Sequence, residues 1–532
     1  MKTDKIILTN VGALEAKYGA DGVRAVKTAL ARLIVADRAR GISSRLVAID
    51  DAATMQKLSA SAVTKAGSAR QNKEAIDVVY RALEPDYILL VGSVDVIPHQ
   101  DLRNPVFVKK SDDEDTDHDA PGDLPYACEA GYSRKIEDFV GPTRVVGRIP
   151  GLEGAKEPSY LVRLLTLAAD AKPLKPEDYA SYLALSAQVW KRSTQRSARN
   201  VFGDSKSVMT VPPRKSEWPK EMLERRMHLI NCHGGRYATE FWGQSVADEN
   251  RYPIALKASY VDGKIAPGTV AAAECCYGGQ LNGVSASRPR LGICETYLGS
   301  GSYGFVGSTT IAYGDLERNG MADLLCQFFL ENVRGGASLG RAFLQARQTF
   351  VRTASLLDPS ELKTLAQFNL YGDPSLAPVW IGAPASTARM ESATAIRSEQ
   401  AKRRDRRRAL YEQGLALAQT APVPRKTAKK APTAIRRALQ AKARQLKLRP
   451  ATLLSFAIQH PAAEKRGALA AVAMASAEGS EAPLPAAYHV LFCKRKRKLP
   501  AAVRKLGIVD VSALIGKEVD GELASVARIQ SR

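Results

Sequence analysis

Short runs of uninterrupted apolar residues recur through the first 380 residues, and they constrain the fold more than any other feature. Most are separated by segments with helical spacing, such as residues 22–40, where Val23, Val26 and Leu30 share one face. Strands that are apolar along their whole length are buried on both faces, as in parallel sheets covered by helices. We therefore expect an α/β fold with a mostly parallel sheet. Its strands should include residues 5–9, 45–50, 86–92, 143–150, 181–190, 227–232, 269–275 and 302–308. Further helices are expected at 157–171, 215–226, 318–333 and 338–354.

Charge divides the chain at about residue 385. The net charge of the 532 residues is +22, yet residues 389–532 alone hold 30 basic and 11 acidic residues. A chain of this length also exceeds a single ordinary core. We expect two α/β subdomains, residues 1–155 and 156–385, followed by a basic C-terminal extension, residues 386–532, that is partly disordered or a small helical module.

The basic extension contains blocks of like charge such as AKRRDRRRALYEQ and CKRKRK. Such blocks attract phosphate backbones or acidic protein surfaces without reading sequence, so a nucleic acid or an acidic protein partner is one hypothesis. Aromatic residues for base stacking are few and scattered. A solvated tail and an inhibitory or self-cleaved segment are the alternatives. The stretches LRPATLLSFAIQ (448–459) and GALAAVAMA (467–475) suggest helices.

Other features bear on the compartment and on metal binding. No run of about 18 apolar residues occurs, and the N-terminus lacks the pattern of a secretory signal, so we expect a cytoplasmic protein without a membrane partner. Seven cysteines in a long chain do not resemble a disulfide framework. The acidic run SDDEDTDHD (111–119) offers carboxylates for calcium but lacks the offsets of an EF-hand, and a solvated, disordered loop is the preferred interpretation.

Two apolar strands end in residues that can perform chemistry. MHLINCHGG (227–235) places His233 at a strand end before Gly234, and GTVAAAECCYGG (268–279) does the same with a cysteine pair. A thiol protease needs a thiolate, a nearby imidazole and amide donors for an oxyanion, and ligands gather at the carboxyl ends of parallel strands. Taken singly, a histidine at a strand end and a buried cysteine are more often structural.

The paired pattern resembles the caspase-like clan CD of cysteine peptidases and, within it, the gingipain-type family. DYILLVGSVDVIP, VVGRIP, TEFWGQ, GFVGSTTIAYG and FNLYGDPSLAP look like segments of that family in the same order, over roughly residues 80–380. The resemblance implies a three-layer α/β/α fold and a cysteine endopeptidase that acts on proteins or peptides through a Cys/His dyad and an acyl-enzyme. It implies no metal and no organic cofactor.

The resemblance also implies roles for single residues. Cys276, followed by one residue and a glycine, matches the nucleophile better than Cys275, and strand alternation agrees. His233 would be its partner, and the N–H groups of Gly234 and Cys276 would form the oxyanion hole. The substrate site would include Trp242, Tyr313 and Gln188.

Two departures from the family leave questions open. Gln188 stands where the family has an acidic residue that supports the histidine. The basic stretch KRSTQRSAR (191–199) follows where an arginine-cutting member has an aspartate, so arginine preference is not expected. The three arginines there favour an acidic substrate residue or belong to a solvated loop. The competing hypothesis is a basic nucleic-acid- or partner-binding protein on a caspase-like scaffold with weak or no peptidase activity.

Overall fold

A ten-stranded sheet forms the centre of the molecule. The computed structural model describes residues 3–109, 113–213, 218–285, 288, 290–316, 318–353, 357–381, 393–460, 487–494 and 499–532. The strands lie in the order β2 (Ser44–Ala48), β1 (Lys5–Thr9), β3 (Tyr87–Val91), β6 (Val146–Ile149), β15 (Phe368–Gly372), β13 (Gly304–Ser308), β12 (Val270–Ala273), β9 (Met227–Asn231), β7 (Tyr182–Ala187) and β8 (Val208–Val211).

Neighbouring strands of this sheet are parallel except at one junction. β13 and β15 pair antiparallel, with Val306 opposite Leu370, and every other neighbouring pair is parallel. The central strands are buried along their length, as in β3, where all five residues are buried. Burial on both faces explains their uninterrupted apolar sequences.

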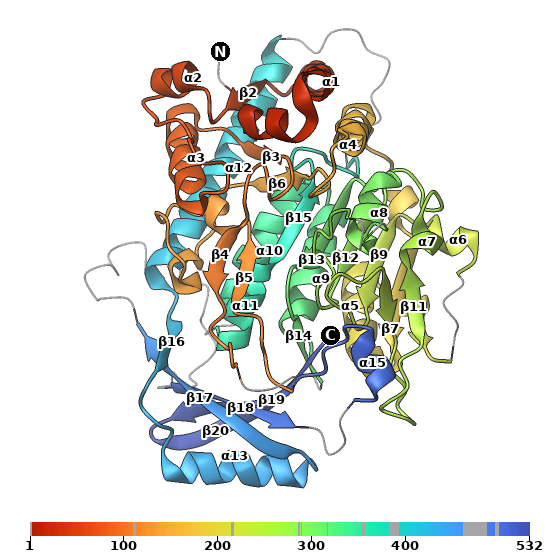
Figure 1. The fold of residues 1–532 in the computed structure, drawn as a ribbon, viewed down its shortest axis with the longest axis vertical. Coiled ribbons are helices and arrows are strands. Elements are labelled where there is room, and N and C mark those ends of the chain that lie inside the picture. The colour runs from red at the N-terminus through yellow and green to blue at the C-terminus, as the bar shows by residue number, and fades with distance from the viewer. Residues whose placement is uncertain are drawn as a thin grey trace.

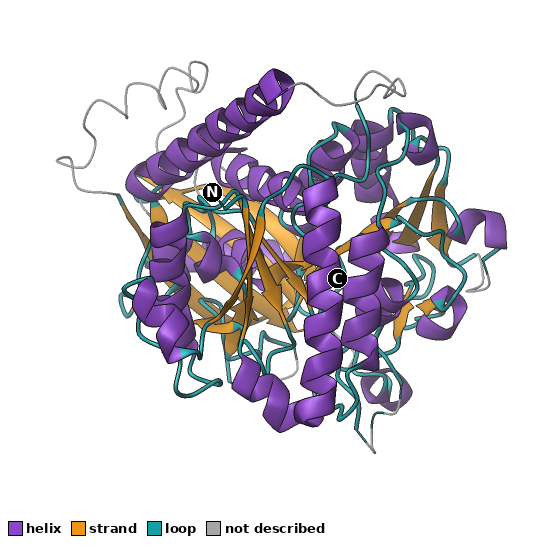
Figure 2. Ribbon diagram, turned by 90° about the horizontal axis from the view of Figure 1, so that it is seen from above, coloured by secondary structure: helices purple, strands orange, loops and turns teal. Residues whose placement is uncertain are grey.

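Helices cover both faces of the sheet, which makes the molecule a three-layer α/β/α structure (Figure 2). On one side, α1 (Val11–Ala39) packs against α4 (Ser159–Asp170), which in turn packs against α8 (Ile293–Gly299). On the other side, each helix packs against the next in the order α5 (Lys191–Phe202), α9 (Ala322–Arg334), α10 (Leu339–Thr353) and α12 (Ala393–Thr420). The expected fold class, a three-layer α/β/α architecture with a mostly parallel sheet, is confirmed.

The remaining elements are shorter, apart from α3. They are the helices α2 (Ala52–Lys57), α3 (Ala69–Leu83), α6 (Lys220–Leu223), α7 (Ala258–Val261), α11 (Pro359–Gln367) and α15 (Ala501–Lys505), and the hairpins β4 (Gln100–Arg103) with β5 (Asp119–Gly122) and β10 (Glu240–Trp242) with β11 (Ile254–Lys257). Within the described residues 218–226, the helix predicted over 215–226 is limited to α6, which begins directly after Pro219. No helix of the described residues is long and apolar enough to cross a membrane.

The C-terminal extension is built around an antiparallel sheet, seen in blue at the bottom of Figure 1. Its strands are β16 (Val423–Thr427), β17 (Arg449–Gln459), β18 (Ala487–Lys494), β19 (Ser512–Val519) and β20 (Glu522–Ser531), and α13 (Thr433–Gln445) packs on one face. The core between helix and sheet includes Ile435, Leu439, Leu491 and Leu514.

The helix predicted over 448–459 is wrong. Residues 449–459 form β17, which pairs with β16 on one side and β18 on the other. A short apolar run fits a helix or a strand, and here the two partner strands decide. The second predicted helix, residues 467–475, lies outside the described residues.

The C-terminal sheet also includes one strand from the first 385 residues. β14 (Tyr313–Asp315), which follows β13 of the central sheet, pairs antiparallel with β20 (Figure 1). The last residues of the chain therefore run beside the carboxyl ends of the central strands.

Candidate active site

His233 and Cys276 follow two neighbouring strands. β9 and β12 pair in parallel with Met227 opposite Val270 and Ile230 opposite Ala273, and this register continued beyond the strands brings His233 beside Cys276. The two backbones are in direct contact, because a Cβ atom at Gly234 would lie 1.7 Å from the carbonyl oxygen of Cys276. Only glycine fits at position 234 without moving the backbone of Cys276.

Two backbone amides at these strand ends point at one oxygen atom. The N–H of Cys276 donates to the main-chain carbonyl oxygen of Arg532 at 3.0 Å, and the N–H of Gly234 donates to the same oxygen at 3.4 Å. Arg532 is the last residue of the sequence. Paired N–H donors on one carbonyl oxygen are the arrangement that stabilises an oxyanion in acyl transfer.

The Cys276 thiol is buried against the segment that leads into β14. Its sulfur accepts from the N–H of Ala312 at 3.3 Å and donates to the carbonyl oxygen of the same residue at 3.5 Å. Burial raises the pKa of Cys276 to about 12, against the opposing effects of the Ala312 N–H and of Lys363. In this state the sulfur is a neutral thiol with no exposed surface.

Cys275 faces different surroundings. Its sulfur lies 3.7 Å from the carbonyl oxygen of Ile230 on the neighbouring strand, and its side chain is also fully buried. Burial raises the pKa of the Cys275 thiol well above its usual range. Cys276 donates its backbone N–H to Arg532, and this contact distinguishes it from Cys275.

His233 is held by Gln244. The Nε2 atom of His233 lies 3.0 Å from Oε1 of Gln244, whose amide nitrogen donates to the carbonyl oxygen of Glu249 and to the hydroxyl of Tyr252. This chain of donors assigns the proton of His233 to Nε2 and leaves Nδ1 as the basic nitrogen. The rings of Trp190 and Tyr252 pack on the imidazole, with centroids 4.4 and 5.0 Å away.

Gln188 does not support the histidine, although its place in the sequence suggested that role. Its Oε1 accepts from the N–H of Val246. The supporting amide comes from Gln244 because an antiparallel bridge between His233 and Trp242 folds the following segment back beside the ring. The signal was present in TEFWGQ, where the glutamine follows Trp242 and Gly243.

The side chain of Arg532 occupies a pocket next to His233 and Cys276. It is fully buried, its guanidinium lies over the ring of Trp190 at 4.5 Å, and its Nη2 donates to Asp323 at 2.7 Å and to the carbonyl oxygen of Asp315 at 3.2 Å. A Cβ atom at Gly314 would lie 1.9 Å from the Nη2 atom. The absence of a side chain at position 314 therefore makes room for the guanidinium.

Two acidic residues define the charge of this pocket. Asp323 accepts from Arg532 and from the side-chain amide of Asn231. Burial and the neighbouring Asp323 raise the pKa of Glu274 well above its usual range, which favours its neutral form. The Arg532 guanidinium pairs with Asp323 at 2.7 Å, so the pocket suits a cationic side chain.

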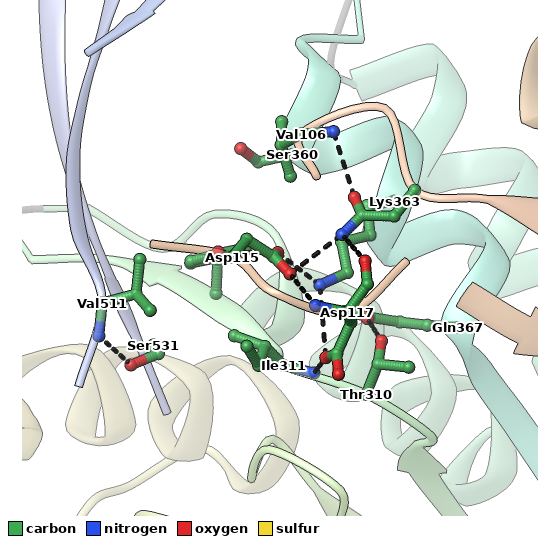
Figure 3. A network of polar contacts seen from close by, with 12 residues as sticks. Val106, Asp115, Asp117, Thr310, Ile311, Ser360, Lys363, Gln367, Val511 and Ser531 are labelled. Atoms are coloured by element: carbon green, nitrogen blue, oxygen red, sulfur yellow. Dashed lines mark hydrogen bonds and ion pairs between the residues drawn. The ribbon is translucent and has the colours of Figure 1, made fainter. Parts of the chain in front are cut away.

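Residues 113–119 of the acidic run, the part that the structure describes, are ordered, which corrects the expectation of a solvated, disordered loop for them. Asp115 and Asp117 are buried. Asp115 accepts from Lys363 at 2.6 Å, and Asp117 accepts from the N–H of Ile311 (Figure 3). The hydroxyl of Tyr313 also donates to Asp115, and that of Tyr277 donates to Asp117.

These two aspartates hold the backbone segments that adjoin Cys276 and Ala312. Asp117 holds the residue after Cys276 and the residue before Ala312, whose amide contacts the thiol. The partners of both aspartates come from distant parts of the sequence and neutralise the local charge, so composition alone suggested solvation.

The other two predicted substrate-site residues contact different parts of the C-terminal extension. Tyr313 is buried, directs its hydroxyl to Asp115 and pairs through its backbone with Ser531. Trp242 exchanges two backbone hydrogen bonds with His233 and packs in a cluster with Tyr252, Val503 and Ile508. The arginines of residues 191–199 lie exposed on α5 and belong to a helix, where a loop was expected.

The described part of the chain contains no group of three or more His, Cys, Asp or Glu side chains arranged to hold a metal ion. All seven cysteines lie within the described ranges, and each is buried and outside any disulfide. The groups that converge at this site are thus a thiol, an imidazole, two amides and the acidic pocket.

No family model and no curated protein matches the chain. Solved structures with a similar fold include the arginine-specific cysteine proteinase gingipain R, at 11% identity and a TM-score of 0.43 over 100% of this chain and 92% of that chain. The complex of the pro- and mature domains of Porphyromonas gingivalis RgpB is similar at 10% identity and a TM-score of 0.45, over 98% of this chain and 99% of that chain. The Saccharomyces cerevisiae separase–securin complex matches at 15% identity and a TM-score of 0.28, over 44% of this chain and 14% of that chain. The likeness is one of general fold class.

Proposed function

We propose that the protein is a caspase-like cysteine endopeptidase that cuts peptide bonds after arginine. The observation that carries the proposal is the convergence of the Gly234 and Cys276 amides on a single carbonyl oxygen, beside the Cys276 sulfur. Membership of the gingipain-type family is part of the proposal, and the collinear segments of residues 80–380 support it.

The geometry supports a two-step reaction. In the first step Nδ1 of His233 takes the proton of the Cys276 thiol, the sulfur attacks the scissile carbonyl carbon, and the two amides stabilise the oxyanion. His233 then delivers a proton to the leaving amine as the C–N bond breaks, which leaves a thioester. In the second step His233 accepts a proton from water, the hydroxyl attacks the thioester, and the acid product leaves with restoration of the thiol.

The preference for arginine departs from the expectation drawn from the basic stretch after β7. It is supported by the contacts of Arg532, whose carbonyl lies at the amides and whose side chain fills the pocket of Trp190 and Asp323. A guanidinium stacked on an indole and paired with a buried carboxylate gains from both contacts. A neutral side chain would leave Asp323 buried without a cation, which costs about 3–5 kcal/mol.

The test compares the wild type with Cys276→Ala on a diverse peptide mixture, with cleavage sites read by mass spectrometry. Cys275→Ala is the matched control, since it removes an adjacent buried thiol that does not donate to Arg532. We expect cuts after arginine with the wild type and with Cys275→Ala, and none with Cys276→Ala. Loss of cleavage in Cys275→Ala with retention in Cys276→Ala would reverse the assignment.

The competing hypothesis of a binding protein on the same scaffold predicts a different result. It predicts no Cys276-dependent cleavage in any of these proteins. Cuts at residues other than arginine that still require Cys276 would retain the peptidase and reject the proposed pocket.

A further inference from the structure

We propose that the active-site cleft is a docking site for the chain's own C-terminal strand, which closes the site in cis. The surface consists of the edge of β14 and the pocket of Trp190 and Asp323, and its occupant is residues 529–532. This inference rests on the proposed function, because it describes the regulation of the same site.

The backbone of the occupant binds as an added strand. β20 pairs antiparallel with β14, with Tyr313 opposite Ser531 and Asp315 opposite Ile529. The N–H of Arg532 donates to the carbonyl oxygen of Ala312 at 3.0 Å, one residue before β14 begins. Addition of an extended segment to an exposed strand edge is a common way in which proteins bind peptides.

The side chain and carbonyl of Arg532 then fill both parts of the catalytic centre. The guanidinium takes the acidic pocket and the carbonyl oxygen takes both amide donors. An entering substrate needs these same groups, so substrate and C-terminal strand exclude each other.

A second contact holds residues 503–510, which precede β19, beside the segment that follows His233. Gly235 forms a backbone bridge with Ile508, and the hydroxyl of Tyr252 donates to Asp510 at 2.8 Å. Val503 and Ile508 pack against Trp242 and Tyr252. The C-terminal segment thus lies on both flanks of His233 before it reaches Cys276.

Covalent connection favours occupation by the chain itself over occupation by a free peptide. β20 is continuous with the antiparallel sheet and pairs with β19 along nearly its whole length. A tethered ligand acts at an effective concentration in the millimolar range, far above that of most free substrates.

The state of the thiol agrees with a closed site. Cys276 has no exposed surface, and its sulfur is held by the backbone of Ala312. Departure of residues 529–532 would admit water to the sulfur and leave the two amides free for a substrate carbonyl.

The experiment measures access to Cys276 without relying on peptide hydrolysis. The full chain and its Arg532→Glu variant are treated with iodoacetamide, and alkylation of Cys276 is followed by mass spectrometry. A glutamate at position 532 places a negative charge against Asp323 and Glu274, so the strand end should leave the pocket. Arg437→Glu, on the exposed face of α13, is the matched control for the change of charge.

We expect Cys276 to be alkylated roughly a hundredfold faster in Arg532→Glu than in the wild type, as for loss of one strong buried pair. Arg437→Glu should match the wild type, and Cys128, buried elsewhere, should stay protected in all three. Equal alkylation of Cys276 in wild type and Arg532→Glu would overturn the docking proposal. Arg532→Ala provides a second test if Arg532→Glu does not fold.

Hydrolysis of an arginine-containing peptide, measured on the same samples, separates the two proposals. Faster alkylation with faster hydrolysis supports both. Faster alkylation without hydrolysis supports the docked strand and counts against the peptidase, and unchanged alkylation with ready hydrolysis in the wild type does the reverse. A wild-type alkylation rate that increases on dilution would show that the strand comes from a second copy, which contradicts occupation in cis.

Discussion

Replacement of Lys363 by methionine should destabilise the protein by about 4 kcal/mol at pH 7, with a smaller loss at lower pH. The Lys363 ammonium lies 2.6 Å from Asp115, and both side chains are fully buried. The other groups facing Asp115 include the side-chain amide of Asn104, the hydroxyl of Tyr313, and the backbone N–H and carboxylate of Asp117. None of these supplies a cation in place of Lys363.

The magnitude follows from the alternative open to Asp115. Without Lys363 the Asp115 carboxylate can avoid a buried charge by binding a proton. At pH 7 this protonation costs about 1.4 kcal/mol for each of the three or so pH units by which the solution pH exceeds the ordinary pKa of the carboxyl. Burial already raises the pKa of Asp115 with Lys363 present, because desolvation exceeds the effect of the lysine. Removal of Lys363 must raise that pKa further.

The sign of the pH dependence follows from proton binding. A carboxyl whose folded pKa is raised binds a proton on folding, so its stabilising effect is present at low pH and is lost as pH rises toward the folded pKa. The deficit of Lys363→Met relative to the wild type should therefore shrink by up to about 1.4 kcal/mol per pH unit between pH 7 and pH 5.

Urea unfolding at several pH values measures this deficit. Lys27→Met, an exposed position on α1, is the control and should change stability by less than about 0.5 kcal/mol. The double variant Asp115→Asn, Lys363→Met should recover much of the loss, since both charges are removed together. A loss of stability under about 1 kcal/mol for Lys363→Met, or a loss independent of pH, would refute the buried ion pair of Lys363 and Asp115. It would also refute the support that Asp115 gives to Tyr313.

Three further predictions concern the active site, and each is measured in the Arg532→Ala variant so that the docked strand does not compete with the substrate. Asp323→Asn should lower kcat/KM for arginine peptides by at least about a hundredfold. Glu274→Gln replaces a neutral acid by an isostere and should change kcat/KM less than about threefold. Equal effects of the two variants would contradict a neutral Glu274. Trp190→Leu should raise KM for arginine peptides roughly threefold to thirtyfold through loss of the cation–π contact, and an unchanged KM would place the guanidinium elsewhere. Gln244→Glu should raise the pKa of His233 and shift the pH profile of kcat/KM upward, and an unmoved profile would exclude Gln244 as the partner of the imidazole.

The parts of the fold and site that the sequence predicts are those specified locally. Fully apolar runs predict the parallel strands, and the glycine after His233 marks where backbones approach closely. The neighbouring positions of β9 and β12 then bring His233 and Cys276 together. Each of these features depends on a few consecutive residues and on general rules of sheet packing.

The parts that the sequence does not reveal depend on pairing between distant segments. The acidic run looks solvated until Lys363 and Tyr313 are placed beside it. β17 looks helical until β16 and β18 pair with it. Arg532 is one of thirty basic residues in the extension, and no local pattern distinguishes it from the others.

For the proposed peptidase, the overlap between the proposed arginine pocket and the docked strand restricts how activity could be switched on. A change in Asp323 or Trp190 weakens the hold on Arg532 and on a substrate arginine together, so it opens the site while impairing catalysis. The pairing of β20 with β19, and the contacts of Val503 and Ile508 with Trp242, hold the strand without touching the pocket. An activating partner, ligand or cut that acts on these contacts would release residues 529–532 and leave the arginine pocket intact. Relief of inhibition is therefore expected to act on the C-terminal sheet and its anchor beside His233, away from the catalytic centre.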